Sequence, residues 1–138
     1  QRPLTLIIFD VDGFKQANDT FGHDFGDRTL VEVSKTANLQ VREVDILARY
    51  GGDEFTILLP ETNVEQAFLI AERIRKAVAD VYIDMGGFST FVTISMGIAE
   101  LSFEPQDQSI EDMIRRADQA LYQAKQQGRN KVVIYSDK

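Results

Sequence analysis

The chain of 138 residues contains no cysteine, no tryptophan and only one histidine. Without cysteine it can form no disulfide framework, no thiolate metal site and no cysteine nucleophile. No apolar stretch approaches the roughly 20 residues that a membrane-spanning helix needs, and no segment resembles a signal peptide. We therefore expect a cytoplasmic domain that makes no membrane contact itself, even where the full-length protein is membrane-anchored.

Positive charge is also scarce in this chain. The 15 Lys and Arg residues against 22 Asp and Glu residues give a net charge of −7 and a pI near 4.7. The cations form no block, and a negative chain without a basic patch is poorly suited to binding nucleic acid. A phosphate ligand would therefore have to be held locally, by metal ions and a few cations.

Strand and helix patterns alternate along the sequence. Residues 4–9 form a nearly continuous apolar run, which is typical of a central strand covered on both faces. Residues 91–98 alternate apolar with small or polar side chains, as a strand does. Helical spacing marks residues 30–41, 64–78 and 110–124.

The length fits one domain, residues 1–138, which can bury a core without disulfides or metal staples. A capping box at Thr62-Asn63-Val64-Glu65 is predicted to open one helix, and Gly128 is well placed to end the last one. The predicted element order is β-α-α-β-β-α-β-β-α-β. This order indicates an α/β (α+β) sandwich, with a sheet flanked by helices and an antiparallel hairpin at its centre.

The most informative segment is Arg49-Tyr50-Gly51-Gly52-Asp53-Glu54-Phe55. Apolar runs precede and follow it, and a Gly-Gly pair between two such runs predicts a tight hairpin because glycine adopts positive φ without steric cost. The bare backbone of Gly51 and Gly52 would let a ligand approach closely. Since Asp53 and Glu54 stand at the mouth of this turn, the segment suits phosphate and a divalent metal ion.

Two more carboxylates follow the first apolar run. Asp10 closes that run and Asp12 comes two residues later. If the first strand lies beside the hairpin, Asp10 and Asp53 converge and, with a backbone carbonyl, form the hard oxygen site that Mg²⁺ or Mn²⁺ prefers. Alternatively, Asp12 caps the helix that begins near Phe14 and Asp10 is a solvated strand end. The spacing leaves both interpretations open.

Other polar residues also have a functional and a plainer interpretation. Lys125 and Arg129 stand at the end of the last predicted helix, where cations favour the helix dipole or could hold nucleotide phosphates. Asn18 and Asp27 lie in a polar segment with glycine, where they suit turns and caps or could recognise the edge of guanine. His23, the only histidine, suits a loop or capping role better than a role as ligand.

Arg42, Asp45 and Arg73 lie outside these segments. Arg42 and Asp45 are three residues apart, which is most simply a surface ion pair of little energetic worth. Arg73 is by default an exposed helix charge. Spacing alone therefore gives these residues no function.

Taken together, the motifs resemble the GGDEF domain of bacterial diguanylate cyclases. The matching segments, which follow the family's order over essentially the whole chain, are Asp10-Val11-Asp12-Gly13-Phe14-Lys15, Asn18-Asp19-Thr20-Phe21-Gly22-His23, Gly26-Asp27, the Gly-Gly-Asp-Glu-Phe segment, Ala124-Lys125 and Gly128-Arg129-Asn130. A lone Gly-Gly-Asp-Glu-Phe would be only suggestive, whereas the full set is highly specific. The resemblance implies a nucleotidyl-cyclase palm-like fold with a central mixed sheet, which agrees with the predicted element order.

The resemblance also implies roles for individual residues. Asp10, the Val11 carbonyl and Asp53 correspond to the ligands of two Mg²⁺ (or Mn²⁺) ions in each active site. Glu54 corresponds to an acidic residue needed for turnover, as metal ligand or proton acceptor. The implied substrate contacts are Asn18 and Asp27 for guanine, Gly51 and Gly52 for close backbone approach, and Phe14, Lys15, Lys125 and Arg129 for the phosphates.

Domains of this family condense two GTP molecules into cyclic di-GMP and two pyrophosphates, with one GTP on each of two facing domains. The resemblance therefore implies a homodimer, and the Asp27 carboxylate favours GTP over ATP. Arg42-x-x-Asp45 matches the family's site of inhibition by its own product, which Arg73 would close from a neighbouring domain. The alternative is an inactive domain that binds GTP or cyclic di-GMP and regulates a partner, but every chemical position is filled. Nothing in the sequence argues for a pure dimerisation module.

One departure from the family concerns the start of the chain. Family members usually carry an Asp-x-Leu-Thr segment and a helix before the first strand, whereas this chain begins at Gln1-Arg2-Pro3. We therefore expect a fragment of a longer protein, with a sensor or dimerisation region upstream.

Overall fold

The computed structural model describes residues 2–84, 86–87, 89–101 and 109–136. Its elements are β1 (Leu4–Val11), α1 (Phe14–Phe21), α2 (His23–Asn38), β2 (Ile46–Arg49), β3 (Glu54–Pro60), α3 (Val64–Ala79), β4 (Ile83–Asp84), β5 (Ser89–Thr90), β6 (Ile94–Leu101), α4 (Ile110–Gln126) and β7 (Val132–Ile134). The order is the predicted one, except that three strands instead of two separate α3 from α4. Among the described residues, no helix combines the length and apolar character needed to cross a bilayer.

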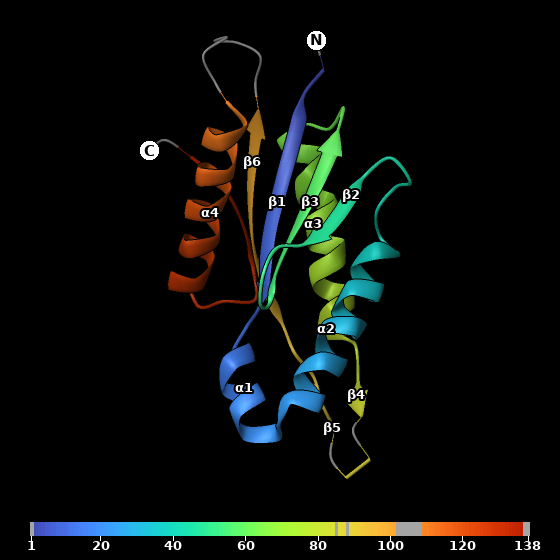
Figure 1. Ribbon diagram of the computed structural model, residues 1–138. Helices are drawn as coiled ribbons and strands as arrows, with labels where there is room; N and C mark the ends of the chain where they lie inside the picture. Colours follow the sequence, from blue (N-terminus) through green and yellow to red (C-terminus); the bar gives the residue numbers. More distant parts are fainter. Residues whose placement is uncertain (1, 85, 88, 102–108, 137–138) are drawn as a thin grey trace.

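Five strands form the main sheet, in the order β2-β3-β1-β6-β7. Neighbouring strands are antiparallel except β6 and β7, which are parallel. Helix α4 covers one face of the sheet, and α2 and α3 cover the other (Figure 1). Strands β4 and β5 pair only with each other in a separate two-stranded ladder. The mixed sheet between helices confirms the predicted sandwich. The hairpin of β2 and β3, however, lies at one edge of the sheet and not at its centre, which β1 occupies.

The central strand β1 contributes to the core on both faces. Ile7 and Phe9 pack in the core under α2 and α3, whereas Leu6 and Ile8 pack under α4. Because successive side chains of a strand point to opposite faces, Asp10 falls on the α4 face of the sheet. The alternation of side chains along β1 therefore places the Asp10 carboxylate under α4.

The start of α3 differs by one residue from the prediction. The capping box forms between Asn63 and Gln66, each bonding the other's backbone, and not between Thr62 and Glu65. The Thr62 hydroxyl donates instead to the carbonyl of Pro60, at 2.8 Å. The same hydroxyl accepts a hydrogen bond from Arg42 Nη2 at 2.8 Å, and this tertiary contact holds Thr62 away from the capping position.

The glycine turn is longer than the predicted tight hairpin. Strand β2 ends at Arg49 and β3 begins at Glu54, so four residues connect them. Gly51 and Gly52 both have positive φ, as expected, at 100° and 21°. The longer turn carries Asp53 outside the strand pairing.

Helix α4 rests directly on the backbone of β6. A Cβ added at Gly97 would lie 2.2 Å from the Ala117 carbonyl oxygen and 2.3 Å from the Leu121 nitrogen. Glycine is required here because any side chain would push the helix away from the sheet.

Both ends of α4 lie where the sequence predicted. The Ser109 side chain accepts a hydrogen bond from the amide of Asp112 at the start. At the end, Gly128 adopts a φ of 115°, and the Arg129 amide donates to the Ala124 carbonyl at 3.0 Å. This is the Schellman geometry, and it turns the chain back toward the sheet.

Candidate active site

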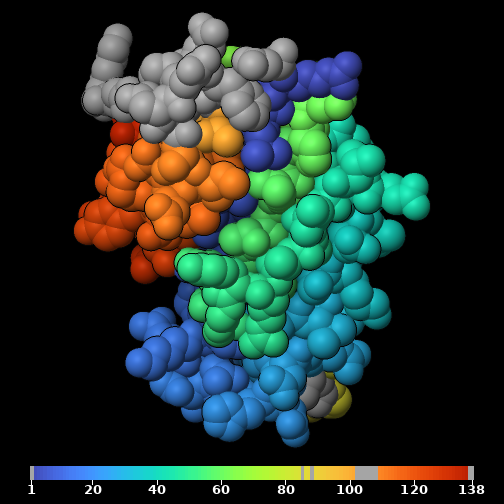
Figure 2. Space-filling model, turned by 45° about the horizontal axis from the view of Figure 1, so that its top comes forward, coloured from blue at the N-terminus to red at the C-terminus, as the bar shows by residue number. Residues whose placement is uncertain are grey.

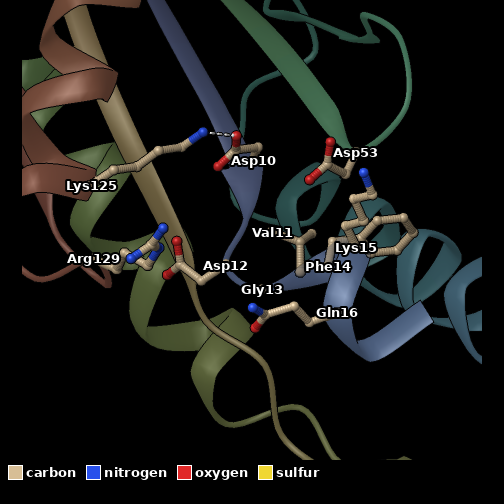
Figure 3. A pocket seen from close by; sticks show the side chains of 10 residues that line it. All are labelled: Asp10, Val11, Asp12, Gly13, Phe14, Lys15, Gln16, Asp53, Lys125 and Arg129. Atoms are coloured by element: carbon tan, nitrogen blue, oxygen red, sulfur yellow. Dashed lines mark ion pairs between the residues drawn. The ribbon is translucent and has the colours of Figure 1, made fainter. Parts of the chain in front are cut away.

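An open pocket of about 620 Å³ lies where β1 ends, between the glycine turn and the end of α4. Lys125 and Arg129 lie on one side of it, Asp53 and Lys15 lie on the other, and Asp10 lies between them (Figure 3). The lining residues are Asp10, Val11, Asp12, Gly13, Phe14, Lys15, Gln16, Asp53, Lys125 and Arg129. The fold therefore brings together seven of the predicted site residues from distant parts of the chain.

Asp10 is the buried acid of this pocket, with 6% of its surface exposed. It pairs in register with Glu54, so β1 does lie beside the hairpin. One carboxylate oxygen, Oδ2, lies 2.5 Å from the Lys125 ammonium. The other, Oδ1, is buried and has no hydrogen-bond partner among the described residues. Asp10 is therefore not the solvated strand end that its spacing also allowed.

The charges in the pocket do not balance around Asp10. Burial raises the pKa of Asp10 above its ordinary value of 3.8, Asp53 and Asp12 add to the rise, and Lys125 opposes it. Burial lowers the pKa of Lys125, but the hydrogen bond to Asp10 and the surrounding carboxylates outweigh it and raise the pKa above 10.5. Asp10 remains incompletely compensated by its lysine, which favours the binding of a further cation.

Lys125 and Arg129 do more than flank a helix end. Lys125 extends from the last turn of α4 into the pocket and forms the ion pair with Asp10 (Figure 3). Arg129 lines the same pocket from the turn after α4, in the left-handed conformation with a φ of 65°. Two cations thus face the pocket from one side.

Asp12 does not cap α1. The N-cap residue is Gly13, and no side chain caps this helix. Instead, the Asp12 carboxylate accepts hydrogen bonds from the hydroxyls of Thr93 and Ser95, at 2.7 and 2.6 Å, and from the Asn130 amide at 3.0 Å. The capping interpretation of Asp12 is therefore wrong.

The two acids of the hairpin, Asp53 and Glu54, lie in different surroundings. Asp53 lines the pocket, while Glu54 is half-buried and faces the α4 side. Burial raises the pKa of Glu54 above 4.5, and the charges of Asp118 and Asp10 raise it further. Gly51 and Gly52 are exposed, and apart from its chain neighbours no atom of the described residues lies within 4 Å of a Cβ added to either. The hairpin surface, green in Figure 2, lies between α4 and the blue surface of α1.

The residues predicted to contact guanine lie apart from this pocket. Asn18 of α1 packs so close to α2 that a Cβ at Gly26 would lie 2.2 Å from its side-chain oxygen. Asp27 lines a separate cavity of about 420 Å³, together with Arg49 and Phe55 of the hairpin strands. His23 begins α2, and its Nδ1 lies 3.3 Å from the Asn18 amide nitrogen.

The residues of the pocket fit a divalent cation that arrives with a phosphorylated ligand. Among the described residues, no three His, Cys, Asp or Glu side chains form a ready-made metal site. Mg²⁺, however, commonly takes one or two carboxylates and completes its octahedron with water and substrate phosphates. The orphaned Oδ1 of Asp10 and the oxygen-only donors of Asp10, Val11 and Asp53 suit such an ion.

A second charged site lies at the opposite end of β3, in the loop before β2. The Asp45 side chain is fully buried. Arg42 donates through Nη2 to its Oδ1 at 2.7 Å and through Nε to its Oδ2 at 3.1 Å. Arg42 also donates to the Pro60 carbonyl and the Thr62 hydroxyl, at 2.9 and 2.8 Å. The ion pair therefore anchors the loop before β2 and is not a simple surface ion pair.

Arg73 lies beside this pair. Its guanidinium donates to the side-chain and backbone oxygens of Gln40, at 3.0 and 2.6 Å, so it is not a free helix charge. Arg42 and Arg73 line one cavity of about 270 Å³ within a single chain. The resemblance implies in addition that the Arg73 of a neighbouring domain closes this site.

Sequence reasoning missed several partners of the site. Gln16 lines the pocket, Thr93 and Ser95 bind Asp12, and Asp118 lies near Glu54. A signal existed for Ser95, because a polar residue in an apolar strand is fully buried only when it is hydrogen-bonded. Gln16 and Asp118 carry no such signal.

Comparisons with known proteins find similarity to diguanylate cyclases and their GGDEF domains. Residues 1–131 match the family described as Diguanylate cyclase, GGDEF domain. Diguanylate cyclase A of Treponema denticola is 43% identical over 131 residues, which cover 95% of this chain and 35% of that protein. The active GGEEF domain of a diguanylate cyclase from Vibrio cholerae gives a TM-score of 0.90 at 39% identity, over 99% of this chain and 85% of that chain. The GGDEF domain of DgcB from Caulobacter crescentus, solved in complex with c-di-GMP, gives 0.89 at 32% identity, over 96% and 77%.

The chain spans about a third of the length of the curated relatives it matches. The five-stranded mixed sheet and its helices are those of these solved domains.

Proposed function

The chain belongs to the GGDEF family of diguanylate cyclase domains, and on that premise we propose that residues 1–138 form one domain that condenses two GTP molecules into cyclic di-GMP and two pyrophosphates. The observation that carries this proposal is the pocket in which a buried acid with one orphaned oxygen lies beside two cations. Such a pocket suits the triphosphate of a nucleotide and a divalent cation together.

Asp10, Asp53 and the Val11 carbonyl would hold two Mg²⁺ or Mn²⁺ ions. When bound, such ions activate an attacking hydroxyl and neutralise the charge of a leaving pyrophosphate. Lys125, now paired with Asp10 at 2.5 Å, would be released toward the phosphates once cations satisfy that carboxylate. Arg129 and Lys15 would bind the phosphates as well, along with the amides at the start of α1.

The guanine base would lie toward Asn18 and Asp27. The cavity of Asp27 also borders the hairpin strands at Arg49 and Phe55, while the turn between those strands borders the phosphate pocket through Asp53. This arrangement suits an extended ligand with its phosphates in one cavity and its base toward the other. The bare backbone of the two turn glycines would let the nucleotide pass close by.

Each domain offers one such nucleotide site, so the reaction would require two domains that face each other. The 3′-hydroxyl oxygen of each GTP would attack the α-phosphorus of the other, which forms the O3′–P bond and breaks the bond to the departing pyrophosphate. The hydroxyl proton would pass to Glu54 or to solvent. Burial raises the pKa of Glu54, which makes its carboxylate a stronger base. Glu54 could alternatively serve as a metal ligand.

The test is turnover by the full-length protein. With GTP and Mg²⁺, we expect pyrophosphate and cyclic di-GMP in a ratio of two to one, and a rate per domain that rises with protein concentration if the dimer is weak. Asp53→Asn should abolish both products, and Asp80→Asn, which removes an exposed charge at the C-cap of α3, should not. Nucleotide binding without turnover, in a protein shown to dimerise, would contradict the cyclase and favour the regulatory receptor.

We further propose that Arg42, Asp45 and Arg73 bind cyclic di-GMP as an inhibitor. Both arginines line one cavity, and a guanidinium can pair with phosphate or with a guanine edge. Losing hydrogen bonds of this charged type costs about 1.5–3 kcal/mol, so Arg42→Ala should weaken inhibition about tenfold or more. Because Arg42→Ala also leaves the buried Asp45 unpaired, Arg73→Ala serves as the second variant. Arg28→Ala, at an exposed arginine of α2 that pairs only with Glu32 among the described residues, is the matched control. Unchanged product inhibition in active Arg42 and Arg73 variants would refute this site.

A further inference from the structure

Three consecutive residues after α4 adopt the left-handed backbone conformation. Their φ values are 115° at Gly128, 65° at Arg129 and 51° at Asn130. Glycine takes this conformation freely and asparagine tolerates it, but an arginine in it costs of order 1–3 kcal/mol and persists only where the surroundings impose it. The turn therefore needs a restraint, and Arg129 is the residue of this turn that lines the pocket.

Asp12 supplies that restraint. Its Oδ2 accepts the hydrogen bond of the Asn130 amide at 3.0 Å, and this amide also lies 3.1 Å from the buried Ser95 hydroxyl. The hydroxyls of Thr93 and Ser95 donate to the two oxygens of the same carboxylate. The Asp12 amide in turn donates to the Thr93 carbonyl at 2.9 Å. One carboxylate thus joins the end of β1, the start of β6 and the turn after α4.

Helix α3 holds the same turn from its other side. Arg75 donates to the side-chain oxygen of Asn130 at 2.9 Å, and its guanidinium is fixed by Glu72 at 2.7 Å. Asn130 is therefore held both through its amide, by Asp12, and through its side chain, by Arg75.

The two aspartates on this side of the pocket differ in how their oxygens are used. Both oxygens of Asp12 already accept hydrogen bonds from uncharged donors of the protein. Asp10 keeps one buried oxygen to which no group in the described part of the chain donates. Three of the roughly four acceptor sites of the Asp12 carboxylate are therefore used by the protein, whereas a metal ion would supply the missing partner of Asp10. The arrangement fits a restraining role for Asp12 and a ligand role for Asp10.

We propose that Asp12 is a positioning residue, which fixes the strained Arg129–Asn130 turn so that the Arg129 guanidinium points at the phosphates of the bound nucleotide. The inference rests on the proposed function, since it assumes that Arg129 meets substrate phosphate. Asp12 acts through Arg129 and does not itself touch the nucleotide or a metal ion.

The test is a double-mutant cycle in the full-length protein, with binding measured calorimetrically. The probe is the α,β-methylene analogue of GTP with Mg²⁺, compared with GMP. Arg129→Ala should weaken binding of the triphosphate about tenfold or more, the loss expected for hydrogen bonds to a charged group. Asp12→Asn should weaken it severalfold, and the double variant should be no weaker than Arg129→Ala alone. GMP, which lacks the outer phosphates, should be affected much less.

Controls separate positioning from loss of folding. Asp80→Asn removes an equal charge from an exposed site and should leave binding unchanged. If Asp12→Asn does not fold, Thr93→Val removes one donor to Asp12 while keeping the side-chain shape, and should weaken triphosphate binding in the same direction by a smaller factor.

Each contrary outcome points to a different failure. Additive effects in the cycle, or full affinity in Asp12→Asn when Arg129→Ala is weakened, would overturn the positioning role alone. Binding of Mn²⁺ in the absence of nucleotide can be measured by electron paramagnetic resonance. If Asp12→Asn lost this binding, Asp12 would be a metal ligand and the positioning role would again be overturned. Full triphosphate affinity in Arg129→Ala would remove the phosphate role of Arg129 and this inference with it, while turnover of GTP would still decide the proposed function.

Discussion

Asp10 and Asp45 are both buried carboxylates paired with a cation, yet they are held in opposite ways. The ammonium of Lys125 lies 2.5 Å from Asp10, and the guanidinium of Arg42 lies 2.7 Å from Asp45. Both oxygens of Asp45 accept hydrogen bonds, including one from the Arg42 amide at 2.7 Å. Asp10 has one oxygen bound and one without a donor among the described residues.

The difference indicates what each acid does. A carboxylate with both oxygens hydrogen-bonded stabilises the loop that surrounds it. A buried carboxylate with an unused oxygen lowers stability and persists where it serves a ligand. The same residue type in the same kind of ion pair can therefore be structural or functional, and the bonding of its second oxygen distinguishes the two roles.

The largest expected effect comes from Asp10→Asn. This substitution keeps an acceptor for Lys125 but removes the charge that would bind a cation, so turnover should fall by about 10²-fold or more, the loss seen when one group that stabilises developing charge is removed. Mn²⁺ affinity should fall as well, measured by titration calorimetry. The matched control is Asp19→Asn, an exposed acid of α1. Undiminished Mn²⁺ affinity in Asp10→Asn would contradict the proposal that the unpaired oxygen of Asp10 binds a divalent cation.

The next effect comes from the same substitution at Asp45. Asp45→Asn weakens the bonds from Arg42, and we expect the free energy of unfolding to fall by about 1–3 kcal/mol. The lower half of this range is favoured, because the Arg42 side chain is 48% exposed and solvent screens its charge. Urea unfolding without metal should show Asp10→Asn to be clearly less destabilised than Asp45→Asn. Equal losses of unfolding free energy in Asp10→Asn and Asp45→Asn would contradict the distinction between a structural Asp45 and a functional Asp10.

The smallest effect is a pH dependence. Because burial raises the pKa of Asp10 in the folded state above 3.8, the native protein holds this proton more tightly than the unfolded chain does. Stability contributed by protonated Asp10 is therefore present below pH 3.8 and is lost as pH rises through the raised pKa. Wild type should lose stability relative to Asp10→Asn over this range, by about 1.4 kcal/mol for each unit of pKa difference. Lys125, with a raised pKa above 10.5, should contribute a loss only at higher pH. Urea unfolding at several pH values, with a chelator present, measures both losses of stability. A stability difference between wild type and Asp10→Asn that did not change with pH would contradict the raised pKa of Asp10.

The sequence predicted most of the fold, because the strongest patterns belong to elements buried on one or both faces. The apolar run of β1 and the stripe of α3 needed no tertiary information. The cap of α3 was misplaced by one residue because the Thr62 hydroxyl is bonded by Arg42, twenty residues earlier, a contact that local propensity cannot foresee. The two-residue strands β4 and β5 are too short to carry a periodic signal.

The site was predictable to the extent that it follows from strand neighbours and motifs. The convergence of Asp10 with the hairpin required only that β1 pair with β3. The ion pair of Asp10 with Lys125 depends on how α4 crosses the sheet, and the bonds of Asp12 depend on a turn more than a hundred residues away. Such long-range contacts leave no trace in spacing.

The contact of α4 with Gly97 has a consequence for control of this domain. Since the helix touches bare main chain, it can neither slide along β6 nor lift from it without opening a gap, so Lys125 stays in register with the strand that bears Asp10. The pocket of one domain should therefore be stiff, with little room for adjustment from within. If two domains pair as proposed, an input signal would act by changing how often and at what angle they meet.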